Sequence, residues 1–149
     1  MTFYIATDHA GYAVKAFTKE LLTQRGHTVI DLGPDSADRV DYPDYGRACA
    51  EAVRDDPGSF GIVICGTGIG ISISANKVPG IRAALCHDAY TAAMARAHND
   101  AHILAFGERV VGRGVIESML DAFVATEFEG GRHDDRVQKI HAIDTHYRR

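Results

Sequence analysis

The sequence predicts an α/β fold, a single-domain, Rossmann-like three-layer sandwich with a five-stranded parallel sheet and a C-terminal helical tail. Short apolar runs alternate with amphipathic helical stretches, and no linker, repeat or low-complexity tract separates them. The length of 149 residues suits one domain, so we expect residues 1–149 to share a core. Five βα units in succession predict a parallel sheet with helices on both faces, joined by right-handed crossovers.

The first half of the chain is predicted to hold three strands and three helices. Residues 3–7 are a compact apolar run that ends in a polar turn. Val14, Phe17 and Leu21 then recur at helical spacing, and Gly26 stands where a C-terminal cap belongs. The other elements are a strand at 27–32, a helix that Pro43 opens and that runs to about residue 55, a buried strand at 60–65 and a helix ending near residue 76.

The second half continues the alternation and ends in a tail. Its elements are a strand at 81–86, a helix at 88–97, a strand at 101–106 and a helix marked by Val115, Ile116, Met119, Leu120, Phe123 and Val124, which Gly130 and Gly131 end. Residues 132–149 are mostly polar and predict a short helix outside the main layer. Its few apolar residues, Val137, Ile140 and Ile143, need burial, so we expect residues 130–149 to pack on a partner subunit.

The predicted sheet also indicates where a ligand would bind. We expect the strand order 2-1-3-4-5, which is common at this length and puts the topological switch between strands 1 and 3. Ligands bind beyond the carboxyl ends of the strands at that switch. Asp8 and His9 follow strand 1 there, and residues 65–70 follow strand 3. These two turns together contain a carboxylate, an imidazole, a thiol and a hydroxyl group, so we predict the functional site there.

Composition and charge exclude several classes of protein. The chain is 46% hydrophobic and 24% charged, which is typical of a globular domain and not of a disordered one. A formal net charge of −4 disfavours binding to nucleic acid or to an anionic membrane surface. No apolar run reaches the roughly 20 residues that a membrane span needs. Three scattered cysteines do not make a disulfide framework. We therefore expect a reduced, soluble, cytoplasmic protein.

The turn after strand 3 contains Gly66, Gly68 and Gly70 in alternate positions. Glycines let the main chain approach a ligand closely, and the N-terminus of the following helix offers free N–H groups to an anion. The spacing matches neither the G-x-G-x-x-G dinucleotide fingerprint nor a P-loop. A tight turn without a ligand is the alternative. Cys65 and Thr67 beside these glycines favour a small-anion or oxyanion site.

Cys65 is the cysteine most suited to chemistry. It ends a buried strand, but a glycine turn and a helix N-terminus follow it, an environment that favours the thiolate. Cys49 lies in an alanine-rich helix and Cys86 ends strand 4, so packing in the core explains both better.

Histidines and arginines supply further candidates. His9 follows strand 1, and His98 stands where the fourth helix stops. A zinc site made of Asp8, His9, Cys65 and His98 lacks any recognised ligand spacing, so we expect no metal.

Arg132 and Arg136 are four residues apart and share one helical face, where they can grip a dianion together. A solvated face that pairs with Asp134 and Asp135 is the alternative. Arg109, just past strand 5, is either a third phosphate ligand or a surface charge.

Seven motifs in order resemble the type B ribose-5-phosphate isomerases, a family that includes the galactose-6-phosphate isomerase subunits. The resemblance covers nearly the whole chain, and the matching segments are Asp8-His9-Ala10-Gly11, Asp41-Tyr42-Pro43, Cys65-Gly66-Thr67-Gly68-Ile69-Gly70-Ile71-Ser72, Ala75-Asn76-Lys77, His98-Asn99-Asp100, Gly107-Glu108-Arg109-Val110-Val111-Gly112 and Glu129-Gly130-Gly131-Arg132-His133.

The resemblance implies an aldose–ketose isomerase without metal or cofactor, working as a homodimer or a dimer of dimers whose active sites are shared between subunits. It implies that Cys65 moves a proton between C1 and C2 and that His98 opens the furanose ring. A glutamate-using branch of the family has its base where this chain has Ile71.

The remaining roles are also those that the resemblance implies. Asp8 and His9 would bind the substrate and handle the ring. The main-chain amides of residues 66–70, with Asn99, would hold the enediolate oxygen. The phosphate would be bound by His9, Arg109, Arg132 and Arg136. These roles add Gly66, Thr67, Gly68, Ile69 and Gly70 to the expected substrate contacts, with Thr67 and Asp8 also expected to act in catalysis.

Ribose 5-phosphate and ribulose 5-phosphate are the expected substrates. The alternatives within the class are a tetrose 4-phosphate and a hexose 6-phosphate such as that of allose or galactose, because the motifs do not fix chain length. From other classes, a sugar-phosphate-binding module explains the glycines and arginines but leaves Cys65 and His98 idle. A metal-dependent isomerase lacks ligand spacing in the sequence.

Overall fold

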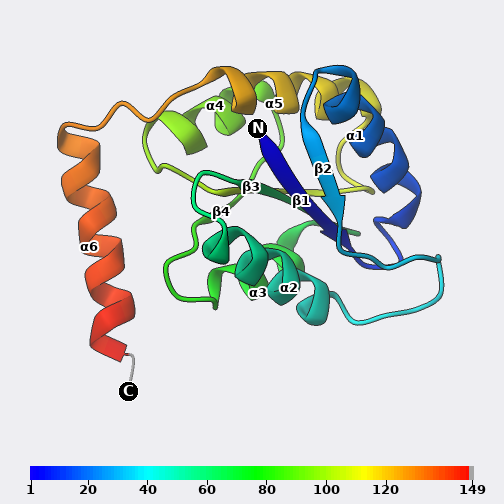
Figure 1. The fold of residues 1–149 in the computed structure, drawn as a ribbon, viewed down its shortest axis with the longest axis horizontal. Coiled ribbons are helices and arrows are strands. Elements are labelled where there is room, and N and C mark those ends of the chain that lie inside the picture. The colour runs from blue at the N-terminus through cyan, green and yellow to red at the C-terminus, as the bar shows by residue number, and fades with distance from the viewer. Residues whose placement is uncertain (148–149) are drawn as a thin grey trace.

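The computed structural model describes residues 1–147. Figure 1 shows strands and helices alternating along the chain. The strands are β1 (Thr2–Thr7), β2 (Thr28–Asp31), β3 (Phe60–Cys65), β4 (Ala83–Leu85) and β5 (Ile103–Gly107). The helices are α1 (Tyr12–Gln24), α2 (Tyr42–Asp55), α3 (Ile69–Asn76), α4 (Ala89–Ala97), α5 (Arg113–Ala125) and α6 (Arg132–Tyr147). Every predicted element through α5 is present within a few residues of its expected bounds.

The three-layer sandwich is confirmed. Helices α1, α4 and α5 cover one face of the sheet, and α2 and α3 cover the other (Figure 1). Side chains along each strand alternate between the two cores, as a period of two requires. In β3, Ile62 and Ile64 belong to the core under α1, α4 and α5, whereas Val63 and Cys65 belong to the core under α2 and α3. The alternation therefore directs the Cys65 side chain toward α3.

The predicted strand order was wrong at its last two positions. All pairings are parallel, but the order is β2-β1-β3-β5-β4, so β5 lies between β3 and β4. All five residues of β5 are buried, whereas the three residues of β4 are partly exposed, as suits a short edge strand. The switch between β1 and β3 is as expected. Because β5 adjoins β3, the end of β5 lies against the turn after β3.

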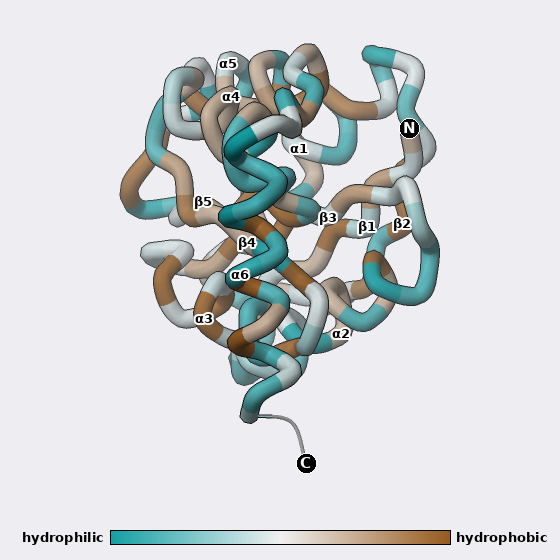
Figure 2. Tube along the Cα trace, turned by 90° about the vertical axis from the view of Figure 1, so that its left-hand side faces the viewer, coloured by the Kyte–Doolittle hydropathy of each residue, from teal (hydrophilic) through white to brown (hydrophobic). Residues whose placement is uncertain are grey.

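Helix α6 is longer than the short helix that was predicted. It has 16 residues and stands beside the β4 edge of the sheet, where Figure 2 shows it in front of β4 and β5. The main-chain N–H of Gly80 donates to Asp144 on α6 over 3.0 Å. Val137 is buried, but Ile140 and Ile143 are exposed. Among residues 1–147, no helix has the length and apolar character needed to cross a membrane.

Candidate active site

A cavity of about 450 Å³ opens at the carboxyl ends of β1 and β3. The two strand ends are held together, because the N–H of Asp8 donates to the carbonyl of Ile64 over 3.1 Å. The lining residues are Asp8, His9, Ala10, Tyr42, Cys65, Gly66, Thr67, Ile69, Gly70, Ile73 and Arg109. The two turns that the sequence singled out therefore meet in one cavity, at the predicted edge of the sheet.

Cys65 is held by the turn that follows it. Its side chain is buried at 4% exposure, and its Sγ accepts the main-chain N–H of Gly68 over 3.1 Å. Thr67 Oγ1 accepts the N–H of Ile69, the first residue of α3, over 3.1 Å. The sulfur thus lies at the N-terminus of α3, where N–H groups without helical carbonyl partners gather.

The close packing of this turn explains two of its glycines. Gly68 has φ +79°, and a Cβ atom there would lie 2.6 Å from the carbonyl carbon of Phe106. A Cβ atom on Gly107 would lie 2.4 Å from the carbonyl carbon of Thr67. Backbone therefore packs on backbone between the end of β5 and the turn after β3, and any side chain at either position would push them apart.

Arg109 reaches the cavity because β5 adjoins β3. The N–H of Glu108 donates to the carbonyl of Cys65 and that of Arg109 to the carbonyl of Gly66, each over 3.0 Å. The guanidinium of Arg109 covers Gly66, since a Cβ atom there would lie 3.1 Å from its Nη1. The sequence placed Arg109 at the correct edge of the sheet, and the corrected strand order explains its contact with the glycine turn.

Asp8 and His9, which follow β1, also line the cavity. Asp8 is buried, and its Oδ1 accepts the N–H of Gly11 over 3.1 Å. His9 Nδ1 lies 3.2 Å from the carbonyl oxygen of Val40 and 3.3 Å from its nitrogen, so the loop before α2 fixes the imidazole ring. Both side chains are therefore held in place before any ligand arrives.

Sequence reasoning gave no role to two of the lining residues, Tyr42 and Ile73. The Tyr42 ring lies against Gly70, where a Cβ atom would be 2.5 Å from its Cε1. Ile73 is exposed at the rim, as is Ile69 one turn earlier on α3. The spacing of Ile69 and Ile73 is the signal that was available, since it puts two apolar side chains on one face of a helix.

His98, Asn99, Arg132 and Arg136 do not line this cavity in the described part of the chain. His98 instead stacks on His133, with ring centroids 4.2 Å apart and an interplanar angle of 10°. Glu129 Oε1 lies 3.5 Å from His133 Nε2 and 4.0 Å from His98 Nε2. This second cluster joins the end of α4 to the start of α6. Sequence reasoning named Glu129 and His133 within one matching segment but gave neither a role, although their spacing of four residues was visible.

Comparison with known proteins identifies the family. The family model described as Ribose/Galactose Isomerase matches residues 3–140. The chain belongs to the ribose/galactose isomerase family. It is 47% identical to ribose-5-phosphate isomerase B of Escherichia coli over 92% of both chains.

Solved structures agree with this assignment to the ribose/galactose isomerases. The structure of ribose-5-phosphate isomerase B from Clostridium thermocellum superposes with a TM-score of 0.97 at 52% identity, covering 99% of this chain and 100% of that one. The Mycoplasma genitalium enzyme with bound ribulose 5-phosphate superposes with a TM-score of 0.92 at 38% identity, covering 97% and 96%. The chain is therefore an aldose–ketose isomerase, as the motifs predicted.

The zinc ligands considered in the sequence do not gather in this isomerase. His98 lies outside the cavity that holds Asp8, His9 and Cys65. Within residues 1–147 the one group of potential ligands is His98, Glu129 and His133, whose ligand atoms lie within 4.8 Å of one another. The two imidazole planes are nearly parallel, so their in-plane nitrogen lone pairs do not converge on one point. We assign no metal to this cluster.

The other two cysteines of the isomerase are core residues, as predicted. Burial raises the pKa of Cys49 to about 12, and Cys49 packs in the core under α2 and α3. Burial likewise raises the pKa of Cys86 to about 11, in the opposite core. Neither thiol is suited to act as a base near neutral pH.

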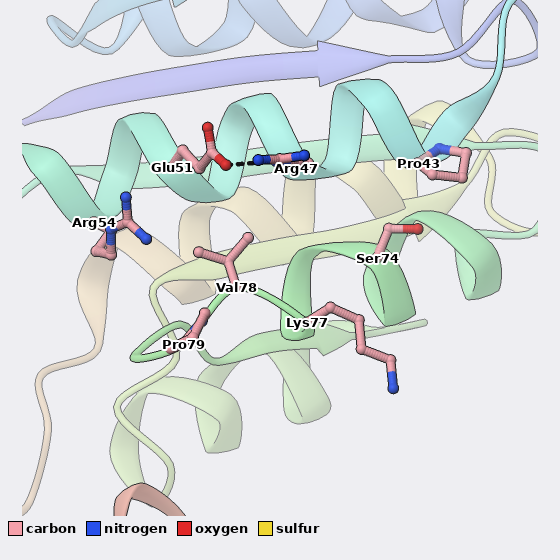
Figure 3. A pocket seen from close by; sticks show the side chains of 8 residues that line it. All are labelled: Pro43, Arg47, Glu51, Arg54, Ser74, Lys77, Val78 and Pro79. Carbon is pink, nitrogen blue, oxygen red and sulfur yellow. Dashed lines mark hydrogen bonds and ion pairs between the residues drawn. The ribbon is translucent and has the colours of Figure 1, made fainter. Parts of the chain in front are cut away.

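A larger cavity, of about 510 Å³, lies between α2 and the end of α3 (Figure 3), and no residue of the Cys65 turn lines it. Two of its four charged side chains pair with each other on α2, with Arg47 Nε 2.6 Å from Glu51 Oε1. The cavity has no cysteine or histidine in its lining. The Cys65 cavity is therefore the candidate active site.

Proposed function

We propose that this protein interconverts ribose 5-phosphate and ribulose 5-phosphate through an enediolate, using its own side chains and no cofactor. The observation that carries the proposal is the Cys65 sulfur at the N-terminus of α3, held by the Gly68 N–H over 3.1 Å inside a cavity of about 450 Å³. The names of the related proteins and the bound ribulose 5-phosphate in one of them support this choice of substrate.

In this reaction the Cys65 thiolate takes the proton from C2 of the open-chain aldose. The C2–H electron pair forms the C1–C2 double bond, and the carbonyl oxygen on C1 gains negative charge. Return of the proton to C1, together with transfer of the O2 hydroxyl proton to O1, gives the ketose with its carbonyl on C2. Gly70 stands in the first turn of α3, where N–H groups have no preceding helical carbonyl, and we assign its N–H to the enediolate oxygen. One such donor is worth about 3 kcal/mol in the transition state.

The ring-opening and phosphate-binding groups complete the site from a second subunit in our proposal. His98 opens the furanose ring, and Asn99 supports the enediolate oxygen. Arg132 and Arg136 bind the phosphate with Arg109 and His9 from the cavity. Two observations support sharing between subunits: the groups near the start of α6 do not line their own chain's cavity, and Ile140 and Ile143 on α6 are exposed.

The proposed homodimer also gives the exposed apolar residues a place to be buried. Ile69 and Ile73 line the rim of the cavity and are about half exposed, at 51% and 55%. A partner subunit whose α6 covers this rim would bury both sets of isoleucines and close the site from water. We place the protein in the cytoplasm, because its three cysteines are free thiols, as is usual in a reducing compartment.

The test is an incubation of the EDTA-treated protein in D₂O with ribose 5-phosphate, followed by proton NMR. Ketose formation with deuterium on carbon supports proton-transfer isomerisation without metal. Parallel incubations with a tetrose 4-phosphate and with allose and galactose 6-phosphates decide the chain length. A strong preference for one of these overturns the pentose proposal, and activity that returns only with an added metal overturns the thiol mechanism.

A further inference from the structure

Asp100 has an unusual backbone conformation for its residue type. Its φ is +46°, and it is the one non-glycine residue with positive φ among residues 1–147. It comes three residues after the end of α4, following His98 and Asn99, at a place where a helix commonly turns away through a left-handed glycine. A left-handed aspartate costs conformational energy that glycine avoids. Glycine would fit this backbone with less strain but has no carboxylate, so the Asp100 carboxylate is the group to examine.

The carboxylate of Asp100 lies between two arginines that are almost buried. Arg96 Nη1 donates to Asp100 Oδ1 over 2.9 Å, and Arg82 Nη2 lies 3.4 Å from Asp100 Oδ2. The arginine side chains are only 10% and 11% exposed. Burial lowers the pKa of Arg82, and the Asp100 charge opposes that shift. One carboxylate thus compensates two cations that have left bulk water.

The same two arginines hold the main chain on both sides of Asp100. Arg82 donates from Nε to the carbonyl of Asn99 over 2.8 Å and from Nη2 to the carbonyl of Asp100 over 2.9 Å. Arg96 donates from Nη1 to the carbonyl of Ala101 over 2.8 Å. Three successive carbonyls are therefore fixed by two guanidinium groups, and the Asp100 carboxylate keeps those groups in place.

The core in turn anchors this cluster. The guanidinium of Arg96 lies over the ring of Phe60, 4.8 Å from its centroid, at the start of β3. Arg82 directly precedes β4. The turn that carries His98 and Asn99 is consequently tied to the central sheet by charged groups, even though it lies outside the sheet.

We propose that Asp100 is a positioning residue for the His98 imidazole, acting through Arg82 and Arg96 and not through contact with the substrate. This inference rests on the proposed function, in which His98 opens the furanose ring. A ring-opening acid and base must meet the ring oxygen and the anomeric hydroxyl at hydrogen-bond distance, and a displacement of 1 Å can cost about 100-fold in rate. Loss of the Asp100 charge releases both arginines and lets the turn relax.

The test uses two reactions of the same enzyme, of which only one needs ring opening. Ribose 5-phosphate is mostly a furanose, whereas ribulose 5-phosphate cannot close that ring because its O5 carries the phosphate. Deuterium exchange at C1 of ribulose 5-phosphate therefore needs Cys65 but not ring opening. We expect Asp100→Asn to lower kcat for ribose 5-phosphate by about 30-fold and the exchange by only about three-fold, with KM changed less than about two-fold.

Two further variants keep the test decisive. Asp100→Gly accepts the left-handed backbone without the carboxylate, and it should show the same difference between the two rates even if Asp100→Asn folds poorly. Asp121→Asn removes an exposed carboxylate 2.5 Å from Arg25 and should change neither rate. An equal fall of both rates in the folded Asp100 variants, or no fall, overturns the positioning role. A wild-type protein that catalyses neither reaction overturns the proposed function instead.

Discussion

The main-chain N–H of Gly68 donates to the sulfur of Cys65 over 3.1 Å. The group that holds the sulfur is thus part of the turn that begins α3, and its position depends on the left-handed conformation of Gly68. Because Gly68 also packs against the backbone of Phe106, the end of β5 supports the same contact. The environment of the proposed base is therefore set by the backbone of the turn and by the end of β5 that packs against it.

Replacing Cys65 with alanine should abolish isomerisation. The proposed base contributes the proton transfer itself, which is worth about 100-fold to 10,000-fold in rate. The measurement is ketose formation and solvent deuterium incorporation from ribose 5-phosphate by NMR. Cys49→Ala is the matched control, since Cys49 is a buried thiol outside the cavity: it should lower the free energy of unfolding but keep kcat. Full activity in Cys65→Ala would show that another group is the base.

Replacing Gly68 with alanine should inactivate the enzyme, and Gly58→Ala provides the control. Both glycines have positive φ, +79° and +89°, so each alanine adds roughly 1–2 kcal/mol of backbone strain. Only Gly68 meets backbone where the Cβ would stand, whereas Gly58 has nothing within 4 Å. We expect similar circular dichroism for both variants, with loss of kcat in Gly68→Ala alone. Equal activity in the two would mean that the turn tolerates displacement of the Cys65 contact.

The sequence predicted correctly those features of the fold and site that depend on local residue patterns. The apolar periodicity located all five strands, and the chemistry of the turns after β1 and β3 located the Cys65 cavity. These features depend on residues that are near one another in sequence. The order of β4 and β5 was missed, because pairing between distant strands depends on which one buries both faces, and periodicity does not rank the strands.

The missed parts of the candidate site have the same physical origin. Sequence reasoning gave Asp100 no role of its own, since its left-handed backbone and its contacts with Arg82 and Arg96 exist only in the folded chain. The stack of His98 on His133 joins two elements separated by all of α5. Neither relationship has a signature in residue spacing, so only the folded arrangement reveals it.

Stability should fall between pH 6.5 and pH 4 because of His102. Burial, reinforced by the nearby Arg82, lowers the pKa of His102 from 6.5 to about 4. Its Nδ1 accepts the main-chain N–H of Arg82 over 3.1 Å, which requires the neutral ring. The unfolded chain binds the proton first as the pH falls, so the stabilisation is complete above pH 6.5 and is lost toward pH 4.

Urea unfolding at pH 7.5 and pH 5 measures this effect. The His102 pKa difference predicts a loss of about 2 kcal/mol over that interval. His102→Asn offers an amide oxygen to the same N–H without a titrating ring, so its stability should depend less on pH by about that amount. Identical pH dependence in the two proteins would show that His102 does not titrate abnormally.

Replacing Arg136 with alanine should raise KM for ribose 5-phosphate by at least about tenfold and change kcat less. The reason is that a guanidinium on the phosphate stabilises the bound substrate and the transition state equally, so its removal weakens both by the same amount. Lys139→Ala is the control, since it removes a cation from the same helix one turn further along. An unaltered KM in Arg136→Ala would make this arginine a surface charge, as would an equal rise in the lysine variant. Arg132→Ala should behave like Arg136→Ala.

Mixing two inactive variants should restore activity if each site is shared between subunits. A heterodimer of Cys65→Ala with His98→Asn has one site that lacks both groups and one site that retains both, because the two groups of a site come from different chains. Co-expression with different tags and purification through both tags isolates this heterodimer, and its kcat per dimer should be about half that of the wild type. Each homodimer keeps one defect in every site and should stay inactive.

If both groups came from one chain, the heterodimer would contain no intact site, so an inactive heterodimer would show that each chain forms its own active site. Because His98 and Cys65 occupy separate parts of the described chain, activity in the heterodimer would also identify the partner as the source of the ring-opening group.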